Sequence, residues 1–357
     1  MVAWSVVLVF LTPLLWSQRK KKKKADEELP NQTLALPQEL PNAVAGDTAH
    51  LVFHLTPLSN KGLLSQQVRD ALRALQRQLD GATVLRLRAF VAGTGDLRRV
   101  PAIVSEMFTE RRMPLPAVSV VQVGGLPMEG AQVVIEATSM AKKPVNPNGI
   151  AFLAARGLST PNPLDPVLPL AEATIPQFRS AIREAGASEV LAVTCFASAL
   201  DSQAALLVRG AFPKAAVDVV QLVRAPSRAV FECEAVARLE RAPASPVESA
   251  DGAVRLNLPR LVFTGSQMGF HSQDSDLRLA FQRLDKSLAA GQAAAAGVVF
   301  VRFYALTRGV ADRVRQVSGE FFSKDRPPAS TVVVLEGLPS LDASFGMDVV
   351  ALPGGSR

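Results

Sequence analysis

A pattern that occurs three times along the chain constrains its fold most strongly. Three strand-like segments each carry an aromatic residue near their end, namely Phe90, Phe196 and Tyr304. The first two aromatic residues are 106 positions apart, and the second and third are 108 apart. A fixed period of this kind is the signature of a repeat architecture. Length alone suggests about two domains for 357 residues, but the period divides the chain into three similar units.

Each unit shows the same predicted order of elements. An amphipathic helix, with apolar residues near i, i+3, i+4 and i+7, precedes the aromatic strand, and a second helix follows it. A strand pattern opens each unit, and two β-rich runs separated by a proline close it. The expected helices are 64–79, 96–110, 170–185, 201–213, 275–290 and 309–323, the opening strands are 50–53, 149–152 and 260–263, and the prolines are Pro127, Pro226 and Pro339.

The order is a β-hairpin followed by α-β-α-β-β, which predicts an α+β fold with helices on one face of each sheet. We expect the units at 47–141, 149–241 and 255–353, the second being the most divergent. The segments between them, 142–149 and 242–252, are rich in Pro, Gly and polar residues, as is typical of domain boundaries.

A leader of 46 residues precedes the units. Val2 to Trp16 is mostly apolar, and Arg19 and a run of five lysines follow it. This stretch is short for a membrane span, which needs about 20 residues. Three interpretations remain open: a signal peptide, a short anchor that holds the chain at the cytoplasmic face, or a wrongly assigned start. We therefore expect a cytoplasmic location or membrane contact through the leader, and export if residues 1–18 are a signal peptide.

Composition excludes several classes of protein. Hydrophobic residues make up 48% of the chain, enough for packed cores. Residues 1–46 hold six basic and four acidic side chains, so +5 of the net charge of +7 belongs to the units. Both Trp residues also lie in the leader, which leaves little aromatic surface for base stacking. We expect no nucleic-acid partner, no metal and no cofactor, and we expect Cys195 and Cys233 to be small buried side chains.

The closing segments resemble the Rid family, also called YjgF/YER057c/UK114 or RidA-like and formerly labelled endoribonuclease L-PSP. The first unit has a Pro-Ala-Val-Ser-Val-Val-Gln-Val run at 116–123, then Pro127, then an Ile-Glu-Ala strand end at 135–137. The family has P-A-R-S, a strand, L-P and I-E-A at these places. The third unit is similar at 328–339, and its Ser266 follows a strand as in the family's S-G-Q start.

The resemblance implies a chorismate-mutase-like fold, a trimer whose sheets face a central barrel with helices outside, and pockets between subunits. Three tandem units suggest a single-chain pseudo-trimer that needs no second copy. The physical argument agrees, because a sheet covered on one face must bury the other, and three units in a ring would cover all three.

One family residue is missing from all three units. In characterised enamine and imine deaminases of the family, the Arg of P-A-R-S binds the substrate carboxylate, which suits guanidinium geometry. The matching positions here are Val118, Val217 and Ser330. The departure places the family's reaction in doubt at these pockets.

An acid is kept in all three units. Glu136, Glu234 and Asp348 match the family glutamate that handles the catalytic water. They would serve either as a catalytic acid and proton shuttle or as structural carboxylates paired with neighbouring bases.

Bases for such pairs lie on the aromatic strands. By the two-residue alternation of a strand, Arg86 and Arg88 share a face with Phe90, and Arg302 is equivalent to Arg88. Arg88 with Glu136, and Arg302 with Asp348, would pair if their strands are neighbours. The alternatives are that these arginines replace the missing anion-binding Arg or are solvated.

The sequence is compatible with three functions. The first is a metabolite-binding pseudo-trimer with small-molecule pockets between units, which also include Ser266. The second is a hydrolase that deaminates enamines or imines, of the 2-aminoacrylate type, with the retained acids. The third, an RNA-binding or RNA-cleaving protein, is disfavoured by the charge distribution and by the absence of a His/Lys catalytic set.

Overall fold

The computed structural model describes residues 38–354. They belong to a compact unit that spans Leu36–Arg357. The apolar leader segment and the lysine run lie outside the described residues, as does the rest of the unit Met1–Ala35. Within 38–354, no helix combines the length and the apolar character needed to cross a membrane.

The described chain is a mixed α+β structure with three β-sheets. Sheet 1 has the order β2 (Leu51–Leu55), β5 (Val133–Met140), β3 (Thr83–Ala92) and β4 (Ala117–Val123). Sheet 2 has the order β10 (Val247–Ala250), β11 (Ala253–Leu256), β6 (Ile150–Thr160), β9 (Ala229–Leu239), β7 (Ala187–Ala197) and β8 (Ala216–Gln221). Sheet 3 has the order β1 (Ala43–Gly46), β12 (Leu261–Thr264), β16 (Ala343–Pro353), β14 (Ala293–Ala305) and β15 (Ala329–Val334), and β13 (Gln267–Phe270) also pairs with β16.

The pairing pattern is the same in the centre of each sheet. The aromatic strands β3, β7 and β14 run parallel to β4, β8 and β15 and antiparallel to β5, β9 and β16. The register places three matching pairs opposite each other: Arg88 and Glu136, Thr194 and Glu234, and Arg302 and Asp348. These positions are therefore equivalent, and each acid lies beside the aromatic strand of its own sheet.

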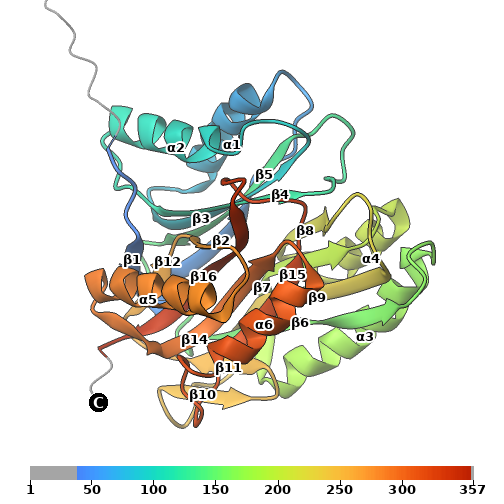
Figure 1. Ribbon diagram of the computed structural model, residues 1–357. Coiled ribbons are helices and arrows are strands. Elements are labelled where there is room, and N and C mark those ends of the chain that lie inside the picture. Colours follow the sequence, from blue (N-terminus) through green and yellow to red (C-terminus); the bar gives the residue numbers. More distant parts are fainter. Residues whose placement is uncertain (1–37, 355–357) are drawn as a thin grey trace, which may run out of the picture. The chain divides into compact units, whose positions relative to one another are not determined.

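Two helices cover one face of each sheet (Figure 1). They are α1 (Leu64–Gln78) and α2 (Arg99–Glu110), α3 (Val167–Glu184) and α4 (Ser202–Ala211), and α5 (Asp274–Ala290) and α6 (Arg308–Ser318), and a short 3-10 helix spans Thr48–His50. All six predicted α-helices are confirmed to within a few residues at each end. In α1, for example, Leu64, Val68, Leu72 and Leu75 are buried at helical spacing against sheet 1. Each helix pair encloses its own apolar core.

The predicted opening hairpins are wrong. β1 pairs with β12 of sheet 3, and not with β2, and β11 pairs with β6 of sheet 2, and not with β12. A strand that precedes one unit therefore extends the sheet of another. This exchange supplies main-chain partners to strand edges that a local hairpin would leave exposed, and it connects the first segment of the described chain to the last sheet.

The expected central barrel is also not closed by hydrogen bonds between the sheets. The three sheets stay separate, and between sheets the backbone is joined by isolated bridges such as Gln122 with Gly337 and Gly125 with Gln221. The physical reason lies in the side chains between the sheets. Large apolar residues, among them Phe90, Phe196 and Tyr304, form a buried cluster there, and several arginines and carboxylates lie beside it.

The expectation of two separate buried thiols is corrected as well. Cys195 and Cys233 form a disulfide between β7 and β9. The register places them directly opposite each other, with Cα atoms 4.0 Å apart. Both are fully buried on the helix side of sheet 2. The bond fixes the two strands that carry Thr194 and Glu234.

Candidate functional site

Six charged side chains from the three sheets meet in the interior. We call them the central ion cluster: Arg86, Arg88, Arg302, Glu136, Glu234 and Asp348. The three guanidinium groups and three carboxylates balance in formal charge. Five of the six residues are no more than 5% exposed, and the side chain of Glu136 is 21% exposed.

Arg88 connects sheet 1 to both other sheets. Its Nε donates to Glu136 Oε2 at 2.7 Å within sheet 1, and its Nη2 donates to Glu234 Oε1 of sheet 2, also at 2.7 Å. Its Nη2 reaches Thr194 Oγ1 at 2.9 Å, and its Nη1 is 3.4 Å from the hydroxyl of Tyr304 in sheet 3. One guanidinium group thus uses its fixed fork of donors on all three sheets.

Arg302 and Arg86 complete the cluster. Arg302 donates to Glu234 of sheet 2 at 2.6 Å and lies 3.3 Å from Asp348 of its own sheet. Arg86 of sheet 1 contacts Asp348 at 3.2 Å, and the Tyr304 hydroxyl donates to the same carboxylate at 2.6 Å. The two pairs expected from the sequence, Arg88 with Glu136 and Arg302 with Asp348, are both present.

The arginines keep the buried carboxylates ionised. Burial alone would raise the pKa of Glu234, but Arg302 and Arg88 hold it below its usual value. Burial likewise opposes ionisation of Asp348, and Arg86 and Arg302 lower its pKa. The pKa of Arg86 falls to about 10 because burial outweighs its attraction to Asp348. These groups form an internal network with its charges matched, which favours the structural interpretation of the three acids over a catalytic one.

The positions of the missing family arginine lie elsewhere. Val118 and Val217 pack against the helix-side cores of sheets 1 and 2. Ser330 is exposed, and its hydroxyl donates to the Pro328 carbonyl. The Ser266 backbone N–H of sheet 3 donates to the Val118 carbonyl of sheet 1 at 3.2 Å. None of these four residues lines the cavity described next.

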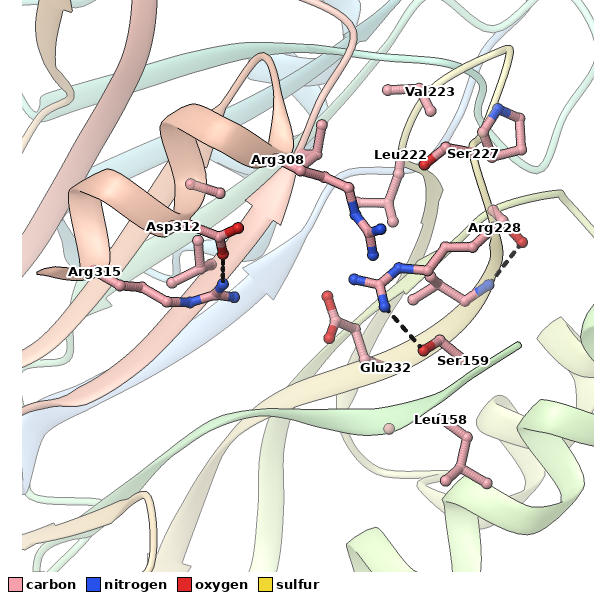
Figure 2. A pocket seen from close by; sticks show the side chains of 17 residues that line it. Leu158, Ser159, Leu222, Val223, Ser227, Arg228, Glu232, Arg308, Asp312 and Arg315 are labelled. Atoms are coloured by element: carbon pink, nitrogen blue, oxygen red, sulfur yellow. Dashed lines mark hydrogen bonds and ion pairs between the residues drawn. The ribbon is translucent and has the colours of Figure 1, made fainter. Parts of the chain in front are cut away.

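That cavity lies between sheets 2 and 3 and has a volume of about 560 Å³, within the usual range of ligand pockets. We call it the Glu232 cavity. β6, β9 and the loop before β9 form one side, and β15 and α6 form the other (Figure 2). Its polar lining residues are Ser159, Ser198, Ser227, Arg228, Glu232, Arg308, Asp312 and Arg315, and its larger apolar ones are Leu158, Leu222, Val223, Val230, Val332 and Val334.

Three charged side chains converge in the cavity. Figure 2 shows the guanidinium groups of Arg228 and Arg308 and the carboxyl of Glu232 directed toward one another from different elements. Arg228 donates to Ser159 Oγ at 3.2 Å. Among residues 38–354, neither Arg228 nor Arg308 forms an ion pair with a carboxylate, whereas Arg315 is 2.9 Å from Asp312. The cavity therefore offers two uncompensated guanidinium groups, the fork geometry that binds carboxylates and phosphates.

The Glu232 carboxyl is half-buried, and burial raises its pKa to about 7, against the opposing effect of Arg315. Its register partner on β6 is Gly157, where a Cβ atom would lie 2.7 Å from that of Glu232. The Phe231 carbonyl oxygen and the Glu232 Cα would lie closer still, so the close approach of the β9 backbone requires glycine at this position. A carboxyl that titrates near neutral pH is suited to exchange protons with a bound molecule.

The equivalent positions of the other sheets do not carry this acid. Glu232 lies opposite Phe196, and the residues opposite Phe90 and Tyr304 are Val134 and Gly346. The combination of a neutral-range carboxyl and uncompensated arginines is thus specific to the interface of sheets 2 and 3.

The sequence prediction missed Glu232, Arg228 and Arg308. The sequence does indicate that Glu232 faces the other sheets, because the two-residue alternation of a strand places it on the same face as Glu234. Arg228 and Arg308 come from a loop and from the first turn of α6. Their proximity to Glu232 depends on how sheet 3 packs on sheet 2, and no local pattern reveals that.

Comparisons with known proteins gave no family. No family model matches the chain, and neither does any curated protein. Among solved structures, the chain is similar to a YjgF-family protein from Neisseria meningitidis at 16% identity, over 27% of this chain and 82% of that one, with a TM-score of 0.25.

Two further examples come from the same comparison. A YjgF/YER057c/UK114-family protein from Mycobacterium tuberculosis is 24% identical over 26% of this chain and 77% of its own, with a TM-score of 0.24. A chorismatase is 11% identical over 85% of this chain and 99% of its own, with a TM-score of 0.27. These values are low and carry no information about ligand or reaction.

Proposed function

We propose that this chain is a Rid-like single-chain pseudo-trimer that binds a small anionic metabolite in the Glu232 cavity. The observation that carries the proposal is the pair of uncompensated guanidinium groups, Arg228 and Arg308, in a cavity of about 560 Å³. Guanidinium groups in such a setting favour a carboxylate or a phosphate, because either anion can accept two parallel hydrogen bonds from one guanidinium group.

Contacts between every pair of sheets support the pseudo-trimer. Arg88 joins sheets 1 and 2 through Glu234, Arg302 joins sheets 2 and 3 through the same acid, and Arg86 joins sheets 1 and 3 through Asp348. The pairing of β1 with β12 adds a main-chain connection between the segment just before the first unit and the third unit. A linear array of three units would leave the first and third apart.

A thermal-shift screen tests the binding function. Carboxylates and inorganic phosphate should raise the melting temperature of the wild-type protein, because a ligand selective for the native state stabilises it. The shift should be lost in Arg308→Ala and kept in Arg313→Ala, a matched change on the outer side of the same helix, where Arg313 is half-exposed. No stabilisation by any anion would contradict the proposal.

A second function is favoured by Glu232. A carboxyl with a pKa of about 7 beside an anion site would support hydrolysis of an enamine or imine after its tautomerisation. Water would add to the imine carbon to give a carbinolamine, the amino group would leave as ammonia after taking a proton from Glu232, and the hydroxyl of the carbinolamine would return its proton to Glu232 as the keto acid forms. Ammonia release from freshly generated 2-aminoacrylate, absent in Glu232→Gln, tests this function. A rate equal to that of buffer would exclude it.

A further inference from the structure

The charges around Glu232 define what the cavity accepts. The charged groups that face it are Arg228 from the loop before β9 and Arg308, Asp312 and Arg315 from α6. The lining residues of β6 and β15 carry no charge. Glu234, two residues along β9, is already held by Arg88 and Arg302. Glu232 is therefore the one acid of the cavity lining that no arginine pairs with among the described residues.

An anion bound by Arg228 and Arg308 would add a negative charge beside this carboxyl. Two carboxylates that share a site cannot both stay ionised at low cost, so the pKa of one of them rises strongly. Since the pKa of Glu232 is already about 7 before binding, a further rise would leave it protonated at neutral pH. A protonated carboxyl donates a hydrogen bond, which a bound carboxylate oxygen would accept.

The rest of the cavity wall is apolar. Leu158 from β6, Val230 from β9 and Val332 and Val334 from β15 surround the space next to the charged groups. Burial of an apolar chain against such a wall is favourable in proportion to the area removed from water. No aromatic residue lines the cavity, so nothing there favours a flat ring by stacking.

We propose that the ligand of the Glu232 cavity is a monocarboxylate with an apolar chain, which binds together with one proton shared with Glu232. The proposal rests on the proposed binding function and names its ligand class. Arg228 and Arg308 hold the carboxylate, Glu232 donates to one of its oxygens, and the aliphatic wall covers the chain. A doubly charged anion fits less well, because it would leave a second negative charge near Glu232 and Asp312.

Calorimetric titration with hexanoate as the probe tests the proposal. Repeating the titration near neutral pH in buffers of different ionisation enthalpy measures the protons taken up on binding. We expect net uptake of up to one proton per hexanoate. As the pH rises above about 7, the affinity should fall by up to about ten-fold per pH unit, because the free carboxyl must then acquire its proton from solvent. At lower pH, where Glu232 is already protonated, uptake should approach zero.

Variants separate the possible outcomes. Glu232→Gln keeps a hydrogen-bond donor without titration, so its hexanoate affinity should be independent of pH above neutrality and proton uptake should vanish. Acetate should bind more weakly than hexanoate, and hexylamine should not bind. Hexanoate binding without proton uptake, or with the same uptake in Glu232→Gln, would overturn this inference and leave the proposed function intact. If hexanoate does not bind while other anions do, this inference is also wrong and the proposed function stands. If no anion binds, both the inference and the proposed function are wrong.

Discussion

Arg88 Nη2 of sheet 1 lies 2.7 Å from Glu234 Oε1 of sheet 2, and both side chains are 2% exposed. Glu234 has no arginine opposite it in its own sheet, where the register partner is Thr194. Its charge is compensated by Arg88 and Arg302, which belong to the two other sheets. The assembly of the three sheets buries Glu234, and without these two arginines it would be an unpaired buried carboxylate, so the same contacts between sheets that bury the charge also offset the cost of burying it.

Arg88→Met tests this dependence. Loss of the guanidinium leaves Glu136 and Glu234 without their shared partner, and breaking a buried pair in this way costs about 3–5 kcal/mol of unfolding free energy. Denaturant unfolding of the variant measures the loss. Arg98→Met is the matched control, since the Arg98 side chain is 76% exposed, and it should change stability by about 0.5 kcal/mol or less. Equal stability of the two variants would contradict the structural role of the cluster.

The raised pKa of Asp218 predicts that an uncharged residue at this position stabilises the protein by an amount that depends on pH. This buried residue of β8 has its pKa raised to about 8, mainly by burial and also by Glu136. The pKa of this acid is higher in the folded state than in the unfolded state, so the unfolded chain loses the proton first as the pH rises. The free energy by which Asp218 destabilises the fold therefore grows as the pH rises from about 4 toward 8.

Asp218→Asn imitates the protonated acid and keeps an oxygen to accept from the Val219 N–H. We expect it to raise the melting temperature by about 2 °C at about pH 8, which corresponds to about 1 kcal/mol in a protein of this size, and by less at about pH 5. Thermal unfolding at both pH values is the measurement, with the exposed Asp342→Asn as control. A gain that is the same at both pH values would show that Asp218 is ionised in the fold.

The disulfide predicts sensitivity to reductant. The bond closes a segment with a sequence separation of 38, so its loss should cost about 2–4 kcal/mol, chiefly through the greater freedom of the unfolded chain. Thermal unfolding with and without reductant measures the effect, and Cys195→Ala/Cys233→Ala should match the reduced protein. Two reactive thiols in the denatured, unreduced protein would show that the bond does not form.

The sequence predicted what depends on periodicity within one unit. The six helices, the aromatic strands and the pairing of Arg88 with Glu136 all follow from spacing along the chain. The disulfide was also within reach, because the register that places Thr194 opposite Glu234 brings Cys195 opposite Cys233. The strand patterns alone predict two small buried side chains, and the bond becomes evident only once the register of the two strands is known.

The remainder depends on how the sheets meet. The contact of Arg88 with Glu234 joins residues 146 positions apart, and the exchange of β1 onto β12 joins opposite ends of the described chain. The cavity combines Arg308 from a helix of one unit with Glu232 from a strand of another. No local pattern encodes these distances, and Val118, Val217 and Ser330, the positions that match the family arginine, lie outside the Glu232 cavity.

The most direct test of the account is the stoichiometry of anion binding. Calorimetric titration with the carboxylate that gives the largest thermal shift should saturate at one molecule per chain, because only the interface of sheets 2 and 3 combines Glu232 with Arg228 and Arg308. The double variant Arg228→Ala/Arg308→Ala should lose this binding, and Arg313→Ala should keep it. Three equal sites per chain, or a single site that survives the double variant, would contradict the assignment of function to the Glu232 cavity.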